Sequence, residues 1–263
     1  MELYCKETGN LNAPIIVFLH GGGVSGWMWN KQIEFFSNYH VLVPDIESHG
    51  NSHNEHFVSI QESARKIIRL IGSKAYGKKV TIVGLSLGAQ ILVEILSEAP
   101  EIVECAVINS ALVRPMKFTK KMIRPMFRMS YGLIKNRRFA KLQAAQLYIS
   151  DENFEIYFEE SKNTLLEDLI QVLESNMSYS LPPEFENAKV KIMVLVGAKE
   201  KGVMIKSAHD MLQSNHYCKG YSVPGIGHGV SLADPQLFNE LTKAWIENGI
   251  MPTKLTALLK SPL

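Results

Sequence analysis

The chain carries the stretch VTIVGLSLGAQILVEIL at residues 80–96, and this stretch decides the fold. Its first part is a short run of apolar and β-branched residues typical of a buried strand, and its last part has apolar residues at helical spacing. Between them lies Gly84-Leu85-Ser86-Leu87-Gly88, a G-x-S-x-G motif in the strand–turn–helix setting that the motif requires. We therefore predict a sharp strand-to-helix turn with Ser86 at its apex.

A serine at such a turn adopts a strained backbone, and the residues two positions before and after it must lack a Cβ so that the chain can pass itself. Gly84 and Gly88 meet this requirement. The turn presents the Ser86 hydroxyl above the carboxyl edge of the sheet, and the N–H of Leu87 points toward an oxyanion at a helix N-terminus. The sequence therefore predicts Ser86 as a nucleophile and Leu87 as one oxyanion donor.

Strand-like and helix-like segments alternate along most of the chain. Apolar runs short enough for buried parallel strands are separated by amphipathic stretches of helical length. This pattern predicts an α/β fold in which a mostly parallel sheet has helices on both faces, and Leu3 to Lys6 is expected to add an antiparallel edge strand. Thr253 to Leu263 is expected to be a short amphipathic terminal piece. The strand-like runs are Ile15–His20, His40–Pro44, Val80–Leu85, Val103–Ile108, Val190–Val196 and Tyr217–Val223.

One long segment, residues 112–188, interrupts this alternation. It has no strand-like run and much helical spacing, and its prolines, including Pro125, are expected near its ends and turns. We therefore predict an α/β core formed by residues 1–111 and 189–263, with residues 112–188 as a helical insertion.

Charge in the insertion is separated along the sequence. Residues 114–141 hold ten Lys and Arg and no acid, whereas residues 151–174 are rich in Asp and Glu. Two interpretations stay open. In the first, the basic half and its Met and Phe side chains meet anionic lipid or an acidic substrate. In the second, helices of opposite charge pack on each other and keep their outer faces solvated.

The composition excludes several classes of protein. The 263 residues are 46% hydrophobic, which is too apolar for a disordered chain. They hold 28 Lys and Arg against 26 Asp and Glu, so the large net positive charge that would attract nucleic acid is absent. No apolar run of about 18 residues is present for an integral membrane segment. The N-terminus lacks the pattern of a secretory signal, and Cys5, Cys105 and Cys218 lack the paired spacing of a zinc or redox site. We expect a cytoplasmic protein with reduced cysteines.

A second motif lies upstream, where His20-Gly21-Gly22-Gly23 directly follows a buried strand. Backbone N–H groups in three successive glycines can approach a ligand without obstruction by side chains. We expect the N–H of Gly22 to be the second oxyanion donor, with the N–H of Gly23 as the alternative. A phosphate-binding role is disfavoured because the spacing matches neither G-x-x-x-x-G-K-[ST] nor G-x-G-x-x-G.

The base and the acid are expected on loops that follow later strands. His228 lies in a glycine-rich turn after the last predicted strand, which places its imidazole over the carboxyl edge of the sheet, although capping of the next helix is the simpler role. Glu200 follows the preceding strand and would orient the imidazole, the alternative being a surface position in a Lys-Glu-Lys turn. Asn109 and Ser110 follow the strand before that, so no rival acid stands there.

Three further histidines, His49, His53 and His56, gather in one short polar segment. A metal site is conceivable. The segment lacks a helical framework and a thiolate, which favours a polar surface loop.

Ser86, Glu200 and His228 in this order, after His20-Gly21-Gly22-Gly23, resemble the α/β-hydrolase fold superfamily over nearly the whole chain. Residues 43–52, VPDIESHGNS, resemble a loop of that family with the pattern P-D-x-P-G-x-G-x-S and depart from it at Glu47 and Ser48. Glu200 stands where the family usually has aspartate. The resemblance implies a catalytic triad, and it implies that residues 112–188 form a mobile cap whose bulky Met, Phe and Tyr residues line an acyl or alcohol pocket.

The expected activity is that of a serine hydrolase, a carboxylesterase acting on a small to medium ester, lactone or thioester through an acyl-enzyme, with no cofactor. The same fold also hosts lyases, perhydrolases and C–C bond hydrolases. An arginine such as Arg114, Arg124 or Arg128 in the pocket would favour a carboxylate-bearing substrate of that kind. A non-catalytic ligand-binding protein of the same fold is the remaining alternative.

Overall fold

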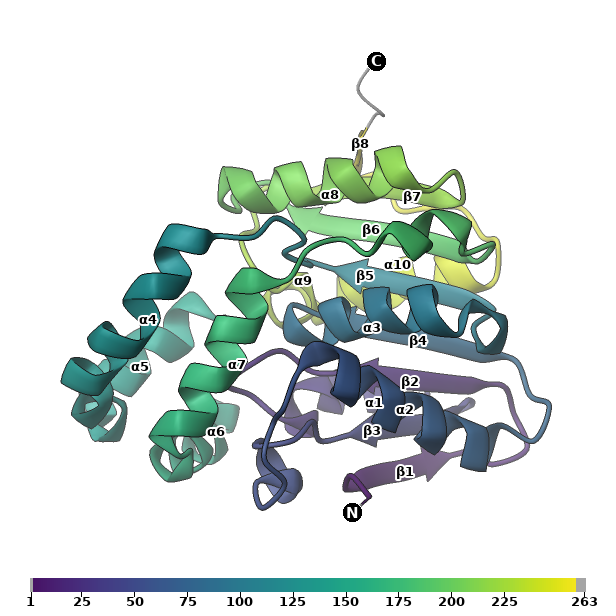
Figure 1. The fold of residues 1–263 in the computed structure, drawn as a ribbon. Helices are drawn as coiled ribbons and strands as arrows, with labels where there is room; N and C mark the ends of the chain where they lie inside the picture. Colours follow the sequence, from purple (N-terminus) through teal and green to yellow (C-terminus); the bar gives the residue numbers. More distant parts are fainter. Residues whose placement is uncertain (1, 259–263) are drawn as a thin grey trace.

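The computed structural model describes residues 2–258, and the apolar runs of the sequence form one mixed sheet in the order β1-β3-β2-β4-β5-β6-β7-β8 (Figure 1). Strands β2 to β7 run parallel, and β1 and β8 pair antiparallel at the two edges. The sequence prediction of a mostly parallel sheet is confirmed. The bounds are β1 (Cys5–Gly9), β2 (Ile15–Leu19), β3 (His40–Pro44), β4 (Val80–Leu85), β5 (Cys105–Asn109), β6 (Lys191–Gly197), β7 (Cys218–Val223) and β8 (Thr256–Leu258).

The central strands are apolar because both faces of the sheet are covered. Every side chain of β2, β3, β4 and β5 is buried, as expected for parallel strands between two helical layers. One face packs against α2 (Ile60–Ala75), α3 (Leu87–Glu98) and α8 (Gly202–Ser214). The opposite face packs against α1 (Asn30–Phe35) and α10 (Pro235–Ile246), through side chains such as Phe238 and Trp245.

The register of the parallel strands aligns their carboxyl ends. Leu85 of β4 lies opposite Asn109 of β5, and Asn109 lies opposite Leu195 of β6. Gly197, at the end of β6, lies opposite Val223, at the end of β7. The residues that follow these four strands therefore share one edge of the sheet.

Four helices stand between β5 and β6 and project beyond this edge (Figure 1). The opposite-charge packing expected from the sequence is present: Arg124 pairs with Glu167 and Glu174, and Arg137 pairs with Glu155. The helices are α4 (Lys117–Ser130), α5 (Arg137–Gln146), α6 (Asp151–Asn163) and α7 (Leu166–Ser178).

Two local expectations are corrected. Pro125 was expected near an end or a turn and instead lies inside α4, where it is exposed, so water can satisfy the carbonyl that loses its intrahelical donor. The terminal piece Thr253 to Leu263 contains β8, which extends the sheet by pairing with β7, while residues 259–263 lie outside the described part. The short α9 (Val230–Ala233) links the turn after β7 to α10. Within residues 2–258, no helix is both long and apolar enough to span a membrane.

Candidate active site

Ser86 lies at the turn between β4 and α3 with φ 53° and ψ −109°, a backbone conformation that L-residues rarely adopt. The chain passes itself closely here. A Cβ on Gly84 would lie 2.4 Å from the carbonyl oxygen of Gly88, and a Cβ on Gly88 would lie 2.3 Å from that of Leu19. The requirement for glycine on both sides of the serine is thereby confirmed.

The Ser86 side chain is left accessible by this turn. It is partly exposed, and its hydroxyl is hydrogen-bonded to no residue within the described range 2–258. Its backbone N–H donates to the carbonyl oxygen of Asn109 at 2.9 Å, which ties the turn to the neighbouring strand β5. Leu87 is the first residue of α3, so no carbonyl within that helix accepts its N–H.

The glycine loop that follows β2 packs against this turn. A Cβ on Gly21 would lie 3.6 Å from the Cβ of Ser86, and a Cβ on Gly22 would lie 3.9 Å from that of Leu87. The N–H of Gly23 donates to Nε2 of His49 at 3.1 Å. Of the two N–H groups expected as oxyanion donors in this loop, that of Gly23 is therefore already engaged.

Two imidazoles, that of the fully buried His20 and that of the partly buried His49, hold this loop. Nε2 of His20 accepts the N–H of Ile46 at 2.8 Å, so its Nδ1 donates to the carbonyl oxygen of Gly21. His49 is arranged in the same way: its Nε2 accepts from Gly23, and its Nδ1 donates to the carbonyl oxygen of Glu47 at 2.8 Å. Burial lowers the pKa of His20 to about 3 and also lowers the pKa of His49. Both rings are therefore neutral near pH 7 and keep these acceptor nitrogens.

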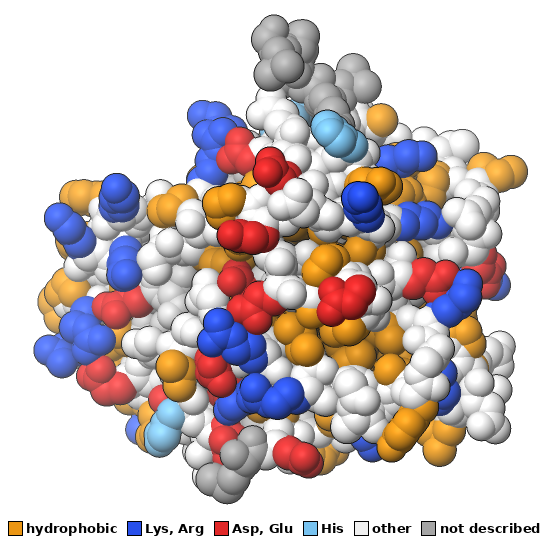
Figure 2. Space-filling model, turned by 45° about the vertical axis from the view of Figure 1, so that its right-hand side comes forward, with side chains coloured by type: hydrophobic (Ala, Val, Ile, Leu, Met, Phe, Trp, Pro, Cys, Tyr) orange, Lys and Arg blue, Asp and Glu red, His pale blue; other side chains and the backbone are white. Residues whose placement is uncertain are grey.

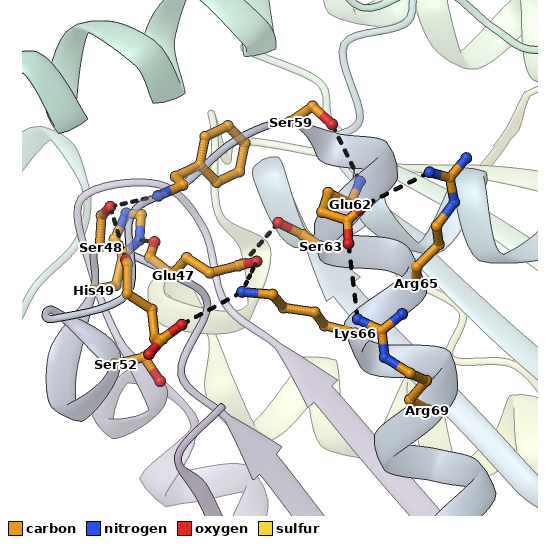
Figure 3. A network of polar contacts seen from close by, with 12 residues as sticks. Glu47, Ser48, His49, Ser52, Ser59, Glu62, Ser63, Arg65, Lys66 and Arg69 are labelled. Carbon is orange, nitrogen blue, oxygen red and sulfur yellow. Dashed lines mark hydrogen bonds and ion pairs between the residues drawn. The ribbon is translucent and has the colours of Figure 1, made fainter. Parts of the chain in front are cut away.

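The loop after β3 owes its position to a buried carboxylate that departs from the family pattern. Glu47 is fully buried and accepts a hydrogen bond from Ser63 Oγ of α2 at 2.8 Å. Its other oxygen lies 3.1 Å from Nζ of Lys66 (Figure 3). Nζ of Lys66 also lies 3.7 Å from a carboxylate oxygen of Glu55. An ion pair with α2 thus anchors the segment that carries His49, and sequence reasoning missed this pair because Ser63 and Lys66 lie on another element.

His228 and Glu200 meet at the same edge of the sheet. Nδ1 of His228 lies 3.0 Å from Oε2 of Glu200, whose side chain is 1% exposed, whereas that of His228 is 36% exposed. Oε1 of Glu200 accepts two hydrogen bonds, from Ser110 Oγ at 2.6 Å and from the N–H of Gly197 at 3.0 Å. Glu200 is therefore a buried, hydrogen-bonded carboxylate and not a surface residue of a Lys-Glu-Lys turn.

Ser110 is the contact that sequence reasoning overlooked. In the sequence, Ser110 showed only that no acidic residue follows β5. Its position directly after that strand could have placed it at the edge of the sheet where Glu200 also lies. It has φ 58° and is fully buried, and its hydroxyl reaches the carboxylate that follows β6.

The helical insertion touches the site from the other side. The hydroxyl of Tyr148 accepts the N–H of Gly227, next to His228, at 2.9 Å. Glu160 of α6 accepts hydrogen bonds from Ser25 Oγ and Trp27 Nε1 at 2.8 and 2.9 Å, and burial raises its pKa. These contacts fasten the insertion to the segment after β2 and to the loop after β7.

A cavity of about 200 Å³ lies between the glycine loop and the insertion. Its described lining contains no Lys or Arg. Phe127 contributes to it, but the methionines of α4 do not, so the expectation that they line a pocket is wrong: Met122, Met126 and Met129 are exposed on the outer side of the helix. The lining comprises Gly22, Gly23, Ser48, His49, Phe127, Ile134, Gln143, Leu147, Tyr157, Ser161, Thr164, Asp168, Leu169, Val172 and Leu173.

The loose histidine cluster is divided among separate partners. His49 holds Gly23, Nδ1 of His53 lies 2.8 Å from the carbonyl oxygen of Gly50, and Nδ1 of His56 lies 3.0 Å from Asp168. In the described part of the chain, no group of three or more His, Cys, Asp or Glu side chains is arranged to hold a metal ion.

Comparison with known proteins identifies the family. The model of the alpha/beta hydrolase family matches residues 16–241, most of the chain. The chain belongs to the alpha/beta hydrolase family. An AB hydrolase superfamily protein of Gibberella zeae is 25% identical over 255 residues, which cover 94% of this chain and 84% of that protein.

Solved structures of other alpha/beta hydrolases share the fold. The enol-lactonase from Burkholderia xenovorans LB400 superposes with a TM-score of 0.78 and 16% identity, covering 93% of this chain and 96% of that one. The thermophilic esterase from Thermogutta terrifontis superposes with a TM-score of 0.77 and 16% identity, covering 94% and 93%. At this identity the likeness concerns the fold.

Proposed function

We propose that this alpha/beta hydrolase is a serine hydrolase of the carboxylesterase type, with Ser86 as nucleophile, His228 as base and Glu200 as orienting acid. The observation that carries the proposal is the pair formed by the buried Glu200 carboxylate and the half-buried His228 imidazole, 3.0 Å apart, at the same sheet edge as the strained turn of Ser86. Because Glu200 holds Nδ1, the other imidazole nitrogen is available to the serine. The hydrogen bond from Ser86 to Nε2 then forms as substrate binds.

The mechanism needs only groups of this chain and water. Nε2 of His228 accepts the Ser86 proton as Oγ attacks the ester carbonyl, and the imidazolium then gives that proton to the departing alkoxide. Water attacks the resulting acyl-enzyme with His228 again as base, which releases the acid and restores Ser86. The Glu200 carboxylate stabilises the imidazolium at both stages.

We assign the oxyanion to the N–H groups of Leu87 and Gly22. Leu87 begins α3, where unsatisfied N–H groups and the helix dipole favour negative charge. Gly22 adjoins Leu87, and its neighbour Gly23 donates to His49. Each such donor contributes about 10²–10³ in kcat.

The cavity beside Gly22 does not have Ser86, His228 or Glu200 in its described lining, and we propose that it receives the substrate through its contact with the glycine loop. The substrate class that we infer from its lining is an uncharged ester or lactone of small to medium size. The lining is mostly apolar and offers Asp168 but no cation, which disfavours the carboxylate-bearing substrates considered for a lyase or a C–C bond hydrolase. Arg114 pairs with Asp210, and Arg124 and Arg128 pair with Glu167, all outside this cavity. An esterase and an enol-lactonase among the similar structures accord with this class.

We further propose that residues 112–188 act as the cap of this site over a core of residues 1–111 and 189–263. The contacts of Tyr148 with Gly227 and of Glu160 with Trp27 would have to break for the cap to open. A cytoplasmic location is part of the same proposal.

The test combines an active-site probe with substrates. The wild-type chain is treated with a fluorophosphonate probe and assayed on p-nitrophenyl esters of increasing acyl length. Ser86→Ala should lose both labelling and turnover, whereas Ser97→Ala, on the same helix with its hydroxyl bonded to Val93, should keep both. Absence of labelling and hydrolysis in the wild type would refute the serine-hydrolase proposal, and labelling without ester turnover would favour the lyase alternatives.

A further inference from the structure

Helix α4 presents a stripe of apolar side chains to solvent. Phe118 is 80% exposed and Met129 is 90% exposed, while Met122 and Met126 are each about half exposed. These four residues, here called the α4 stripe, are three or four positions apart and therefore share one side of the helix. The helix already has another apolar side, on which Ile123 is buried and Phe127 lines the cavity, so the α4 stripe is not explained by packing within the chain.

Lysine side chains lie on the side of α4 that faces α7. Lys121, three positions from Phe118, borders the α4 stripe, whereas Lys120, seven positions from Phe127, lies on the opposite side of the helix. Lys117, Lys120 and Lys121 line a groove of about 810 Å³ between α4 and α7, and within residues 2–258 none of them pairs with an acid. The described lining of that groove has one acidic residue, Glu174, which is already paired with Arg124. Opposite-charge packing therefore accounts for the arginines of α4 and leaves its lysines unneutralised.

Exposed hydrophobic and charged side chains are mixed on the surface of the insertion. Figure 2 shows hydrophobic and basic side chains, with acidic ones among them, along the left edge of the molecule, where the insertion lies. Contiguous exposed apolar side chains on a monomer mark an interaction site more often than chance exposure does. Methionine side chains are unbranched and adaptable, which suits contact with a surface that has no fixed shape.

We propose that this face of α4 docks on the surface of an anionic lipid bilayer. The α4 stripe enters the boundary between headgroups and acyl chains, and Lys121, which borders the stripe, lies near the lipid phosphates. Lys117 and Lys120 lie farther around the helix and add positive charge that attracts the anionic surface from within about one Debye length. A second copy of the chain fits this face less well, because an isologous contact would bring the unneutralised lysines of both copies together.

Docking would set the orientation of the candidate active site. Phe127 lines the cavity from the side of α4 that faces away from the α4 stripe, so a docked α4 separates the bilayer from the cavity by one helix. This consequence rests on the proposed function, whereas docking does not.

The experiment measures binding without turnover. The full chain carrying Ser86→Ala is sedimented with vesicles of phosphatidylcholine alone and with vesicles of phosphatidylcholine and phosphatidylglycerol in equal parts. Binding is expected only to the anionic vesicles and is expected to fall with added salt. Binding to both kinds of vesicle, or to neither, would overturn the proposal, and neither result would bear on the serine-hydrolase assignment.

Two triple variants locate the binding face. Phe118→Ser with Met122→Ser and Met129→Ser, and Lys117→Glu with Lys120→Glu and Lys121→Glu, should each weaken binding at least about tenfold. A control variant makes the same charge change at three exposed positions outside the insertion. It combines Lys31→Glu, Lys219→Glu and Lys243→Glu and should weaken vesicle binding less. Equal loss in this control would overturn the assignment to α4. A dimer in size-exclusion chromatography that the α4 stripe variant abolishes would show that this face binds a second copy instead.

Discussion

The hydroxyl of Ser110 donates a hydrogen bond of 2.6 Å to Oε1 of Glu200, although 90 positions separate the two residues. The contact arises because β5 and β6 are adjacent and in register, so the residues after them meet at one edge. The two carboxylate oxygens of Glu200 have different partners. Oε1 accepts hydrogen bonds from Ser110 and Gly197, and Oε2 faces Nδ1 of His228. A glutamate, one methylene longer than aspartate, is thereby held in a single position.

Removing the Ser110 hydroxyl should slow the reaction without weakening substrate binding. A hydrogen bond to a charged group is worth about 1.5–3 kcal/mol, so we expect kcat of Ser110→Ala to fall roughly tenfold to a hundredfold with KM nearly unchanged. Ser110→Gly separates this effect from backbone strain, because glycine relieves the positive φ of 58° but also lacks the hydroxyl. Both variants should be slow on a p-nitrophenyl ester, and full activity in either one would contradict a positioning role.

Removing the negative charge of Glu200 should lower kcat much more than removing the Ser110 hydroxyl. Glu200→Gln keeps the size of the side chain but removes the charge that stabilises the imidazolium, so kcat is expected to fall by about 10³–10⁴. Steady-state kinetics with Glu186→Gln, an exposed glutamate, as control would measure the effect. Retention of full kcat in Glu200→Gln would show that Glu200 is not the orienting acid.

The turn of Ser86 should tolerate no side chain at Gly88. In Gly88→Ala the new Cβ would lie 2.3 Å from the carbonyl oxygen of Leu19, and moving β2 is expected to cost about 3 kcal/mol in the free energy of unfolding. Gly72→Ala is the matched control, since Gly72 lies in α2 with open space around it and should gain about 0.5–1 kcal/mol. Urea denaturation compares the two, and equal stability of both variants would contradict the close approach.

Acid should lower the free energy of unfolding through the imidazoles of His20 and His49, whose pKa values are lowered in the folded state. Burial lowers the pKa of His20 to about 3 and that of His49 below its usual 6.5, while the unfolded chain takes up these protons near pH 6.5. Below pH 6.5 the unfolded state therefore binds more protons than the native state, and the free energy of unfolding should fall as pH falls toward 3. Glu94 and Glu160 act in the opposite sense, because burial raises their pKa values.

A comparison of variants isolates the histidine contribution. His49→Gln keeps an acceptor for the N–H of Gly23 but cannot titrate, so its stability should depend less steeply on pH between 6.5 and 5. His53→Gln, at an exposed position, should keep the wild-type slope in urea denaturation. An unchanged slope in His49→Gln would exclude a linked proton at this residue.

The sequence by itself determined the features that depend on neighbours along the chain. The strands, the glycines around Ser86 and the order of the chemical residues follow from local rules: side-chain period, φ preferences of glycine, and the turn between a strand and a helix. Predicted and observed strand bounds agree within two residues for Ile15–Leu19, His40–Pro44 and Val80–Leu85.

Only the tertiary structure decided which distant groups meet. Ser110 and Glu200, Glu47 and Lys66, and Gly23 and His49 are brought together by strand register and helix packing, which no local pattern encodes. Tertiary structure also decided that the α4 methionines face solvent. Two sides of that helix are apolar in sequence, and only the fold determines which side is buried. The physical reason is that local conformation is set by each residue's own backbone and near neighbours, whereas contacts across the chain depend on how the complete elements pack.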